Sequence, residues 1–279
     1  NFITMSNFDL FKEKLLMRNL SNSTIKNYCS QIELASKRLG KEIDLIDELD
    51  LKKLVLNDKK RQISSSTQMS IINAFKSYFK LIHNRKFNHD ILPRPKVEQK
   101  QPDILSTDEI QNMINSVNNL KHKSIICLMY SVGLRVSEVI NLKIKDIDSH
   151  NKKINIKNGK GKIDRVVMLD DSVLNLIRSY WQVYKTKTYL FEGAKGDVYS
   201  AKSIQTFVKK SALNVGITKK ISSHSLRHSC FTQLIKNGVD LRTVQKLAGH
   251  KNINTTASYI KIIDDDILST ISPINSIKI

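Results

Sequence analysis

Cysteine is scarce in this sequence, with three residues in 279. Cys29, Cys127 and Cys230 sit among apolar residues at helical spacing, and no two of them form a C-x-x-C pair. A disulfide framework or a zinc site would require more cysteines at characteristic spacings. We therefore expect all three to be reduced core residues rather than metal ligands.

Long hydrophobic runs are missing as well. No apolar stretch approaches the roughly 18 residues of a membrane-spanning helix, and the N-terminal residues lack the apolar core of a signal peptide. We expect a soluble, cytoplasmic protein that has no membrane partner.

Acidic residues are in the minority: 26 Asp and Glu face 46 Lys and Arg, which gives a formal net charge of +20. The basic excess occurs in both halves of the chain rather than in one tail. A charge of this size and spread indicates binding to a polyanion over a wide surface.

The apolar pattern predicts two domains. Residues 1–87 contain four amphipathic segments, at 7–19, from Ser21 or Ser23 to Gly40, at 50–60 and from about 64 to 82. Three of the four prolines then fall in a stretch without apolar periodicity, which predicts a linker at 88–103. The second domain, with a C-terminal tail, occupies 104–279.

The second domain mixes helices with one short alternating region. Helical patterns precede residue 142 and return after residue 171, but apolar residues alternate from Ile144 to Leu169 around the glycine turn N-G-K-G. We predict a mainly α-helical protein whose C-terminal domain holds a small antiparallel β-sheet, with Lys160 at the tip of its last turn.

Several basic residues are candidates for DNA contacts. They share exposed positions on the polar faces of the first-domain helices or on the glycine turn. A merely solvated helix surface is the alternative interpretation for each of them. The candidates are Lys26, Lys59, Lys60, Arg61, Lys76 and Lys162.

The stretch from residue 222 to 263 gathers residues suited to attack on a phosphodiester. His224 and Arg227 are three apart on one predicted helix, and Gly249 ends the next helix so that His250 lies just outside it. Tyr259 follows nine residues later on a third predicted helix.

Phosphodiester transfer needs cations on the nonbridging oxygens, a nucleophile and an acid for the leaving oxygen. Arg135, at a turn between two predicted helices, and Arg227 can clamp the oxygens with planar guanidinium groups. His224 and His250 can donate to the same oxygens or handle the proton of the nucleophile, Tyr259. Lys160 would protonate the leaving oxygen. Each motif alone has a plain structural explanation, such as a core tyrosine or an ordinary turn.

In combination, the motifs GLRVSE, GKGK, HSLRH, LAGH and TTASYI occur in the order found in the tyrosine site-specific recombinases. The sequence closely resembles this integrase family, including its Xer-like members, over nearly its whole length. The resemblance implies a two-domain DNA clamp and an active site of Arg135, Lys160, His224, Arg227, His250 and Tyr259, with Glu138 supporting Arg135.

The resemblance also implies the reaction and the partners. The family joins a 3′ phosphate to its tyrosine and exchanges strands through a Holliday junction, without metal or nucleotide cofactor. The expected partners are double-stranded DNA with paired recombination sites and a homotetramer, or a hetero-oligomer with a related recombinase, in the nucleoid of a bacterial or archaeal cell. The role would be chromosome-dimer resolution or integration and excision of a mobile element.

Two other classes remain open from the sequence. A type IB topoisomerase would use similar phosphotyrosine chemistry without a tetramer, and a non-catalytic DNA-binding protein would explain the charge alone. The ordered set from Arg135 to Tyr259 argues against the second class, and the Xer-like first domain argues against the first.

Overall fold

The computed structural model describes residues 6–57, 64–96, 101–157, 164–257 and 259. The chain divides into two compact units, residues 1–100 and 101–279, each with its own core. The division falls inside the stretch predicted as a linker. However, Phe87 and Leu92 are buried in the N-terminal core, so that core extends into the predicted linker.

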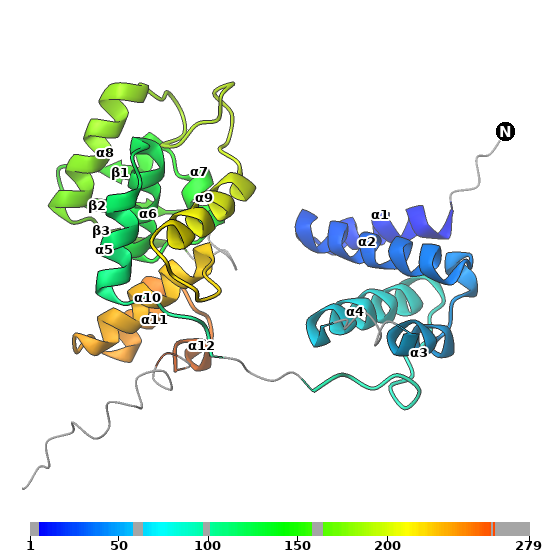
Figure 1. The fold of residues 1–279 in the computed structure, drawn as a ribbon. Helices are drawn as coiled ribbons and strands as arrows, with labels where there is room; N and C mark the ends of the chain where they lie inside the picture. The colour runs from blue at the N-terminus through cyan, green and yellow to red at the C-terminus, as the bar shows by residue number, and fades with distance from the viewer. Residues whose placement is uncertain (1–5, 58–63, 97–100, 158–163, 258, 260–279) are drawn as a thin grey trace, which may run out of the picture. The chain divides into compact units, whose positions relative to one another are not determined.

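The N-terminal unit is a bundle of four α-helices (Figure 1): α1 (Asn7–Met17), α2 (Asn22–Leu39), α3 (Glu48–Asn57) and α4 (Ser65–Ile82), with a short 3-10 helix η1 (Ile43–Leu45) before α3. Serine side chains cap three of these helices, and Gly40 ends α2 in the left-handed conformation. The core lies between α2 and α4, where Ile32, Ile72 and Phe75 are fully buried.

The third helix begins two residues before the predicted start at Asp50. Asp47 provides the reason, because its carboxylate accepts the backbone N–H of Asp50 at 2.8 Å and its carbonyl accepts the N–H of Leu51. The predicted end of this helix, at Lys60, lies outside the described residues.

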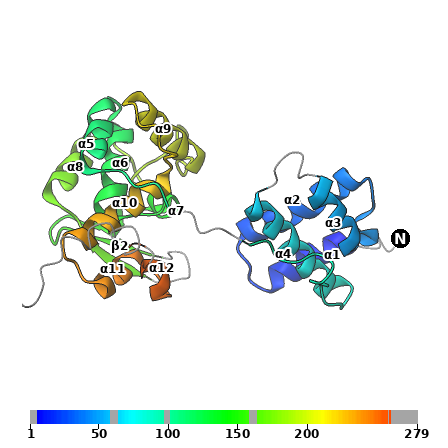
Figure 2. The same ribbon diagram turned by 60° about the horizontal axis from the view of Figure 1, so that its bottom comes forward.

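The C-terminal unit packs helices around a small sheet. Its helices are α5 (Thr107–Ser116), α6 (Leu120–Val132), α7 (Val136–Asn141), α8 (Asp171–Tyr184), α9 (Ala201–Asn214), α10 (Ser223–Lys236), α11 (Leu241–Ala248) and α12 (Ile253–Ala257). A capping box of Ser106 and Glu109 starts α5. Helix α10 packs against α6 and α11 (Figure 2), so Leu226 and Arg227 of the motif HSLRH lie in the interior of the unit.

The sheet is antiparallel in the order β1 (Ile147–Asp148), β2 (Lys153–Ile156), β3 (Arg165–Met168). A mainly helical fold with a small antiparallel sheet is thus confirmed. Ile144, predicted in the alternating region, lies instead in a 3-10 turn, η3 (Ile144–Asp146). The Asp146 carboxylate accepts the N–H of Lys143 and closes this turn.

Within the described parts of the chain, every helix is too short or too polar to cross a membrane. The C-terminal tail after Tyr259 lies outside the described residues.

Candidate active site

Helix α10 carries Arg227 into the interior of the C-terminal unit. Arg227 is 3% exposed, and its guanidinium donates to the carbonyl oxygens of Gly133 and of Ala248, the latter at 2.6 Å. Both carbonyls belong to helix ends, where the last C=O groups have no partner within the helix. The buried cation is therefore held by the C-terminal ends of α6 and α11, whose dipoles favour positive charge.

Gly133 makes this approach possible. It ends α6 with a φ of +64°, and a Cβ atom built on it would lie 2.4 Å from Cζ of Phe231. Only glycine satisfies both the left-handed backbone and the contact with Phe231. Gly133 of the motif GLRVSE therefore packs against Phe231, while its carbonyl accepts the hydrogen bond from Arg227.

Arg135 follows as the N-cap of α7, at the inter-helix turn that the sequence predicts. Its guanidinium donates to Glu138 at 2.8 Å and to the carbonyl of Ala248 at 3.2 Å. Because Arg227 donates to the same carbonyl, the two arginines meet at the end of α11. Glu138 also accepts the backbone N–H of Arg135 at 2.8 Å, so one carboxylate fixes both the main chain and the side chain of this arginine.

A second arginine on Glu138, which the sequence-based assignment missed, comes from the sheet. Arg165 opens β3 and donates to both oxygens of Glu138, at 2.9 and 2.8 Å, and to the carbonyl of Leu247 at 2.7 Å. Burial alone would raise the pKa of Glu138, but hydrogen bonds and charge from Arg165 and Arg135 bring it down to about 2. A signal was present in the sequence, because Arg165 occupies the inward side of an alternating strand together with Val167.

His250 lies one residue beyond the C-cap Gly249, as predicted. Its Nε2 is 3.2 Å from Nη2 of Arg227, and its Nδ1 is 3.0 Å from Oγ1 of Thr256. Because arginine can only donate, Nε2 is the acceptor, which places the proton on Nδ1. Burial and the neighbouring Arg227 and Arg135 lower the pKa of His250 to about 4, so the ring is neutral at pH 7.

Tyr259 lies in a turn just past the end of α12, rather than within a helix as predicted. Helix α12 ends at Ala257, and the N–H of Tyr259 donates to the carbonyl of Thr256 at 3.0 Å. The side chain is 2% exposed and packs against Phe231. Its hydroxyl lies 3.2 Å from Nδ1 of His228, a residue that the sequence-based assignment also left out.

The environment of the tyrosine keeps it protonated and its partner neutral. Burial raises the pKa of Tyr259, although Arg227 and Arg135 act in the opposite direction. Burial, His224 and Arg227 lower the pKa of His228 to about 4. The position of His228, next to Arg227 and one helical turn after His224, was the signal that could have identified it in the sequence.

The structure therefore brings Arg135, Arg227, His250, Tyr259 and the supporting Glu138 together. His224 is exposed on α10, with its ring centroid 6.4 Å from that of His228. Lys160 and Lys162 lie outside the described residues, as do Lys59, Lys60 and Arg61 of the N-terminal unit.

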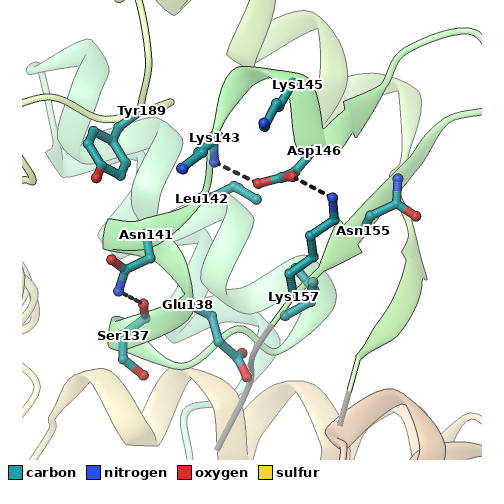
Figure 3. Close-up of a pocket in the computed structure, with 11 residues that line it drawn as sticks. Ser137, Glu138, Asn141, Leu142, Lys143, Lys145, Asp146, Asn155, Lys157 and Tyr189 are labelled. Carbon is teal, nitrogen blue, oxygen red and sulfur yellow. Dashed lines mark hydrogen bonds and ion pairs between the residues drawn. The ribbon is translucent and has the colours of Figure 1, made fainter. Parts of the chain in front are cut away.

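A basic cavity adjoins this cluster on the side of the sheet. It measures about 420 Å³, and Glu138 forms part of its wall (Figure 3). Lys143, Lys145 and Lys157 line it, with Asp146 buried among them. Lys157 is also the last described residue before the glycine turn.

The N-terminal unit has a basic cavity of its own, of about 480 Å³. Lys76, one of the candidate DNA contacts, lines it together with Lys80, Arg85 and Lys86. The other described candidate, Lys26, is exposed on α2. Across the described residues, no group of three or more His, Cys, Asp or Glu side chains is placed to hold a metal ion.

Comparison with known families decides the class. The model of the phage integrase family matches residues 103–265, and the model of the phage integrase N-terminal SAM-like domain matches residues 8–89. The chain belongs to the phage integrase family. One relative is a putative integrase/recombinase, y4qK, of Sinorhizobium fredii. It is 34% identical over 265 residues, which cover 94% of this chain and 86% of the relative.

A second relative supports the Xer-like character of this integrase-family chain. Tyrosine recombinase XerA of Pyrococcus horikoshii is 36% identical over 196 residues, covering 69% of this chain and 68% of the relative. Among solved structures, XerH recombinase bound to its palindromic difH substrate, in a post-cleavage complex, has the same fold: the TM-score is 0.71 at 23% identity, covering 95% of this chain and 85% of that chain.

Family membership makes the protein an enzyme, a site-specific tyrosine recombinase that transfers DNA strands. The two alternatives, a type IB topoisomerase and a non-catalytic DNA-binding protein, are not favoured by these matches.

Proposed function

We propose that Tyr259 is the nucleophile of this recombinase. Its hydroxyl oxygen would attack the scissile phosphorus and form the 3′-phosphotyrosine bond, while the bond from phosphorus to the 5′ oxygen breaks. The 5′ oxygen would leave as a hydroxyl after taking up a proton. The observation that carries this proposal is the convergence of Arg135 and Arg227 on the Ala248 carbonyl, with His250 and Tyr259 in the same cluster.

The two arginines would neutralise the nonbridging oxygens as charge develops on them. The Arg135 side chain has five N–H donors; Nη1 donates to the Glu138 carboxylate and Nη2 to the backbone carbonyl of Ala248. Burial and the nearby Arg135 lower the pKa of Arg227 to about 10, which still leaves it charged at neutral pH. Fixed charges of this kind stabilise a transition state without reorganising.

The remaining assigned residues would manage protons. His250 would donate to a nonbridging oxygen, which requires its proton to move from Nδ1 to Nε2 when a phosphate replaces its contact with Arg227. His224 would serve the same oxygens or take the proton of the tyrosine. Lys160, on the glycine turn, would be the acid for the 5′ oxygen.

The position of Tyr259 fits a nucleophile that is held back. A side chain that is 2% exposed and hydrogen-bonded to His228 cannot attack a phosphate in solution. DNA binding would therefore have to uncover the Tyr259 hydroxyl before cleavage.

The proposed partners are double-stranded DNA with paired recombination sites and further copies of this chain in a tetramer, or a related recombinase in a hetero-oligomer. Strands would be exchanged through a Holliday junction. The likeness to a recombinase bound to difH supports a DNA substrate, and the basic cavity with Lys76 and the exposed Lys26 support a second DNA contact on the N-terminal unit. The two units would together form a clamp.

The biological role would be chromosome-dimer resolution or integration and excision of a mobile element, in the nucleoid of a bacterial or archaeal cell. The relatives support both roles, since one is named an integrase/recombinase and another is named XerA.

Trapping covalent protein–DNA adducts tests the nucleophile. The protein is incubated with genomic DNA of its host, adducts are recovered after denaturation, and the attached ends are mapped to define the site. A duplex carrying that site, nicked beside the cleavage position, then traps the intermediate. We expect Tyr259→Phe to bind this duplex normally and to form no adduct.

The matched control is Tyr184→Phe, which alters a 40% exposed tyrosine on α8 and should form adduct like the unmodified protein. Adduct formation by Tyr259→Phe would disprove the assignment of the nucleophile.

A further inference from the structure

Arg165 is an almost fully buried cation whose donors all point at the active-site cluster. Its side chain is 5% exposed. Nε donates to the Leu247 carbonyl, and Nη1 and Nη2 donate to the two oxygens of Glu138 in a bidentate pair. Burying a charge is costly unless it is paired and hydrogen-bonded, so a buried arginine with this geometry constrains whatever it contacts.

Arg165 and Arg135 donate to the same atom of Glu138, Oε1. Oε1 of Glu138 accepts from Nη1 of Arg165 at 2.9 Å and from Nη1 of Arg135 at 2.8 Å. Oε2 accepts from Nη2 of Arg165 and from the backbone N–H of Arg135. The orientation of the Glu138 carboxylate, and through it that of Arg135, is therefore set from the strand side by Arg165.

Arg165 also braces the turn that carries His250. Its Nε–H holds the Leu247 carbonyl, one residue before the carbonyl of Ala248 on which Arg135 and Arg227 converge. A Cβ atom on Gly249 would lie 3.4 Å from both Cδ and Nη1 of Arg165, so the guanidinium packs closely against this glycine. Arg165 and His250 line one cavity of about 330 Å³.

We propose that Arg165 is a positioning residue for strand cleavage, which sets Arg135 through Glu138 and the His250 turn through Leu247 without touching the phosphate. This inference rests on the proposed function, because it concerns the same cluster. Arginine is required rather than lysine, since only a planar fork can satisfy both carboxylate oxygens and a carbonyl at once.

Single-turnover cleavage of the nicked duplex described above tests the proposal. We expect Arg165→Lys and Arg165→Gln to lower the maximal cleavage rate about 100-fold, because small displacements of positioning groups have effects of that size. The DNA concentration for half-maximal rate should stay within a factor of about three, since nothing that touches DNA is removed. The control is Val167→Ala, which opens a cavity two residues along the same strand without touching the cluster.

The pH dependence separates positioning from plain stabilisation. Two arginines face Glu138 and lower its pKa: Arg135 from α7 and Arg165 from β3. Arg227 of α10 is close enough to interact with Glu138, and Arg165 also lowers the pKa of His250. The pKa values of both Glu138 and His250 therefore rise without Arg165, and the acidic limb of the rate profile in Arg165→Gln should move to higher pH.

The background Glu138→Gln completes the test. If Arg165 acts through Glu138, its substitution lowers the cleavage rate much less in that background, and the part of the acidic-limb shift that Glu138 causes disappears. The double variant also removes both buried charges together, which protects against unfolding caused by a carboxylate that has lost a partner.

Three results would overturn the inference: an unchanged rate in Arg165→Lys, an equal loss of rate with and without Glu138, or a loss that follows the melting temperature as in Val167→Ala. Failure of the proposed function looks different, because Tyr259→Phe would then still form adduct in the same assay.

Discussion

Glu138 is the residue that organises the positive charges of this site. It faces Arg135 and Arg165 at distances of 2.8 to 2.9 Å, and the two arginines and Arg227 together donate to three carbonyl groups at helix ends. A recombinase must keep several guanidinium groups close together before any phosphate is present. The carboxylate and the carbonyl ends of α6 and α11 compensate the repulsion among them.

The two half-buried histidines of the site add a pH dependence of stability. His228 and His250 have folded-state pKa values lowered to about 4 by burial, and then by His224 and Arg227 for the former and by Arg227 and Arg135 for the latter. An unfolded histidine titrates near 6.5, so between pH 6.5 and 4 the unfolded chain binds protons that the folded chain excludes. Stability should therefore fall as the pH drops through this window.

We expect a loss of about 2 kcal/mol for each histidine at pH 4.5 relative to pH 7.5, after allowing for partial exposure of the rings. Glu138 contributes little above pH 4.5, because its stabilisation is lost as the pH falls from its unfolded pKa of about 4.5 towards its folded pKa of about 2. Urea unfolding at the two pH values measures the difference. The variant His228→Gln should lose less unfolding free energy between the two pH values than the unmodified protein. An equal loss would argue against a half-buried, neutral His228.

The residues of the site were predictable from the sequence to different degrees. Arg135, Arg227 and His250 lie where motif spacing placed them, because each is tied to a helix end that a glycine or a cap marks. Arg165 and His228 were not assigned, since their functions depend on contacts between elements far apart in the chain. The inward position of Arg165 on its strand can be read from the sequence, but its contact with Glu138, 27 residues away, cannot.

At the scale of elements, the active-site helices are joined by glycines with specific geometry. Periodicity predicted the helices of both units well, because their apolar faces are long. It failed for short elements: the apolar pattern around Ile144 did not distinguish a 3-10 turn from a strand, and α12 ends before Tyr259 although the spacing indicated a helix there. Short segments are determined by single hydrogen bonds, such as that from Lys143 to Asp146.

The end of α6 offers a test at this scale. Gly133→Ala places a Cβ atom 2.4 Å from Phe231 Cζ and forces an L-residue into the left-handed conformation. We expect a loss of about 2–4 kcal/mol from strain and overpacking together, with a strong loss of cleavage because the Gly133 carbonyl holds Arg227.

Gly238→Ala is the matched control, since Gly238 has a φ of +82° but no atom within 4 Å of an added Cβ. It should cost only about 1 kcal/mol and leave the cleavage rate of the folded enzyme unchanged. Similar losses of stability in the two variants would show that the contact with Phe231 is unimportant. Denaturant unfolding and the adduct assay give the two measurements.

At the scale of the whole molecule, the basic charge is divided between two units with separate cores. Phe75 and Phe79 belong to the N-terminal core, and Ile126 and Leu226 to that of the C-terminal unit. Each unit also carries a basic cavity. In the proposed clamp, the connection near residue 100 would serve to join two DNA contacts covalently, so its presence would matter more than the identity of its residues.

Cutting the chain between residues 100 and 101 should therefore yield two folded pieces, because among the described residues each of the two core clusters lies wholly within one unit. Each piece should bind the mapped site more weakly than the intact chain, since the connection supplies a high effective concentration for the second contact.

The logarithm of the intact chain's binding constant should fall with the logarithm of salt concentration, with a slope of about 0.9 per phosphate neutralised. Each piece should give a shallower slope, and the two slopes should add to roughly that of the whole. Gel-shift titrations at several salt concentrations measure all three. If the C-terminal piece alone matched the intact chain in affinity and slope, the N-terminal unit would not contact DNA and the clamp would be wrong.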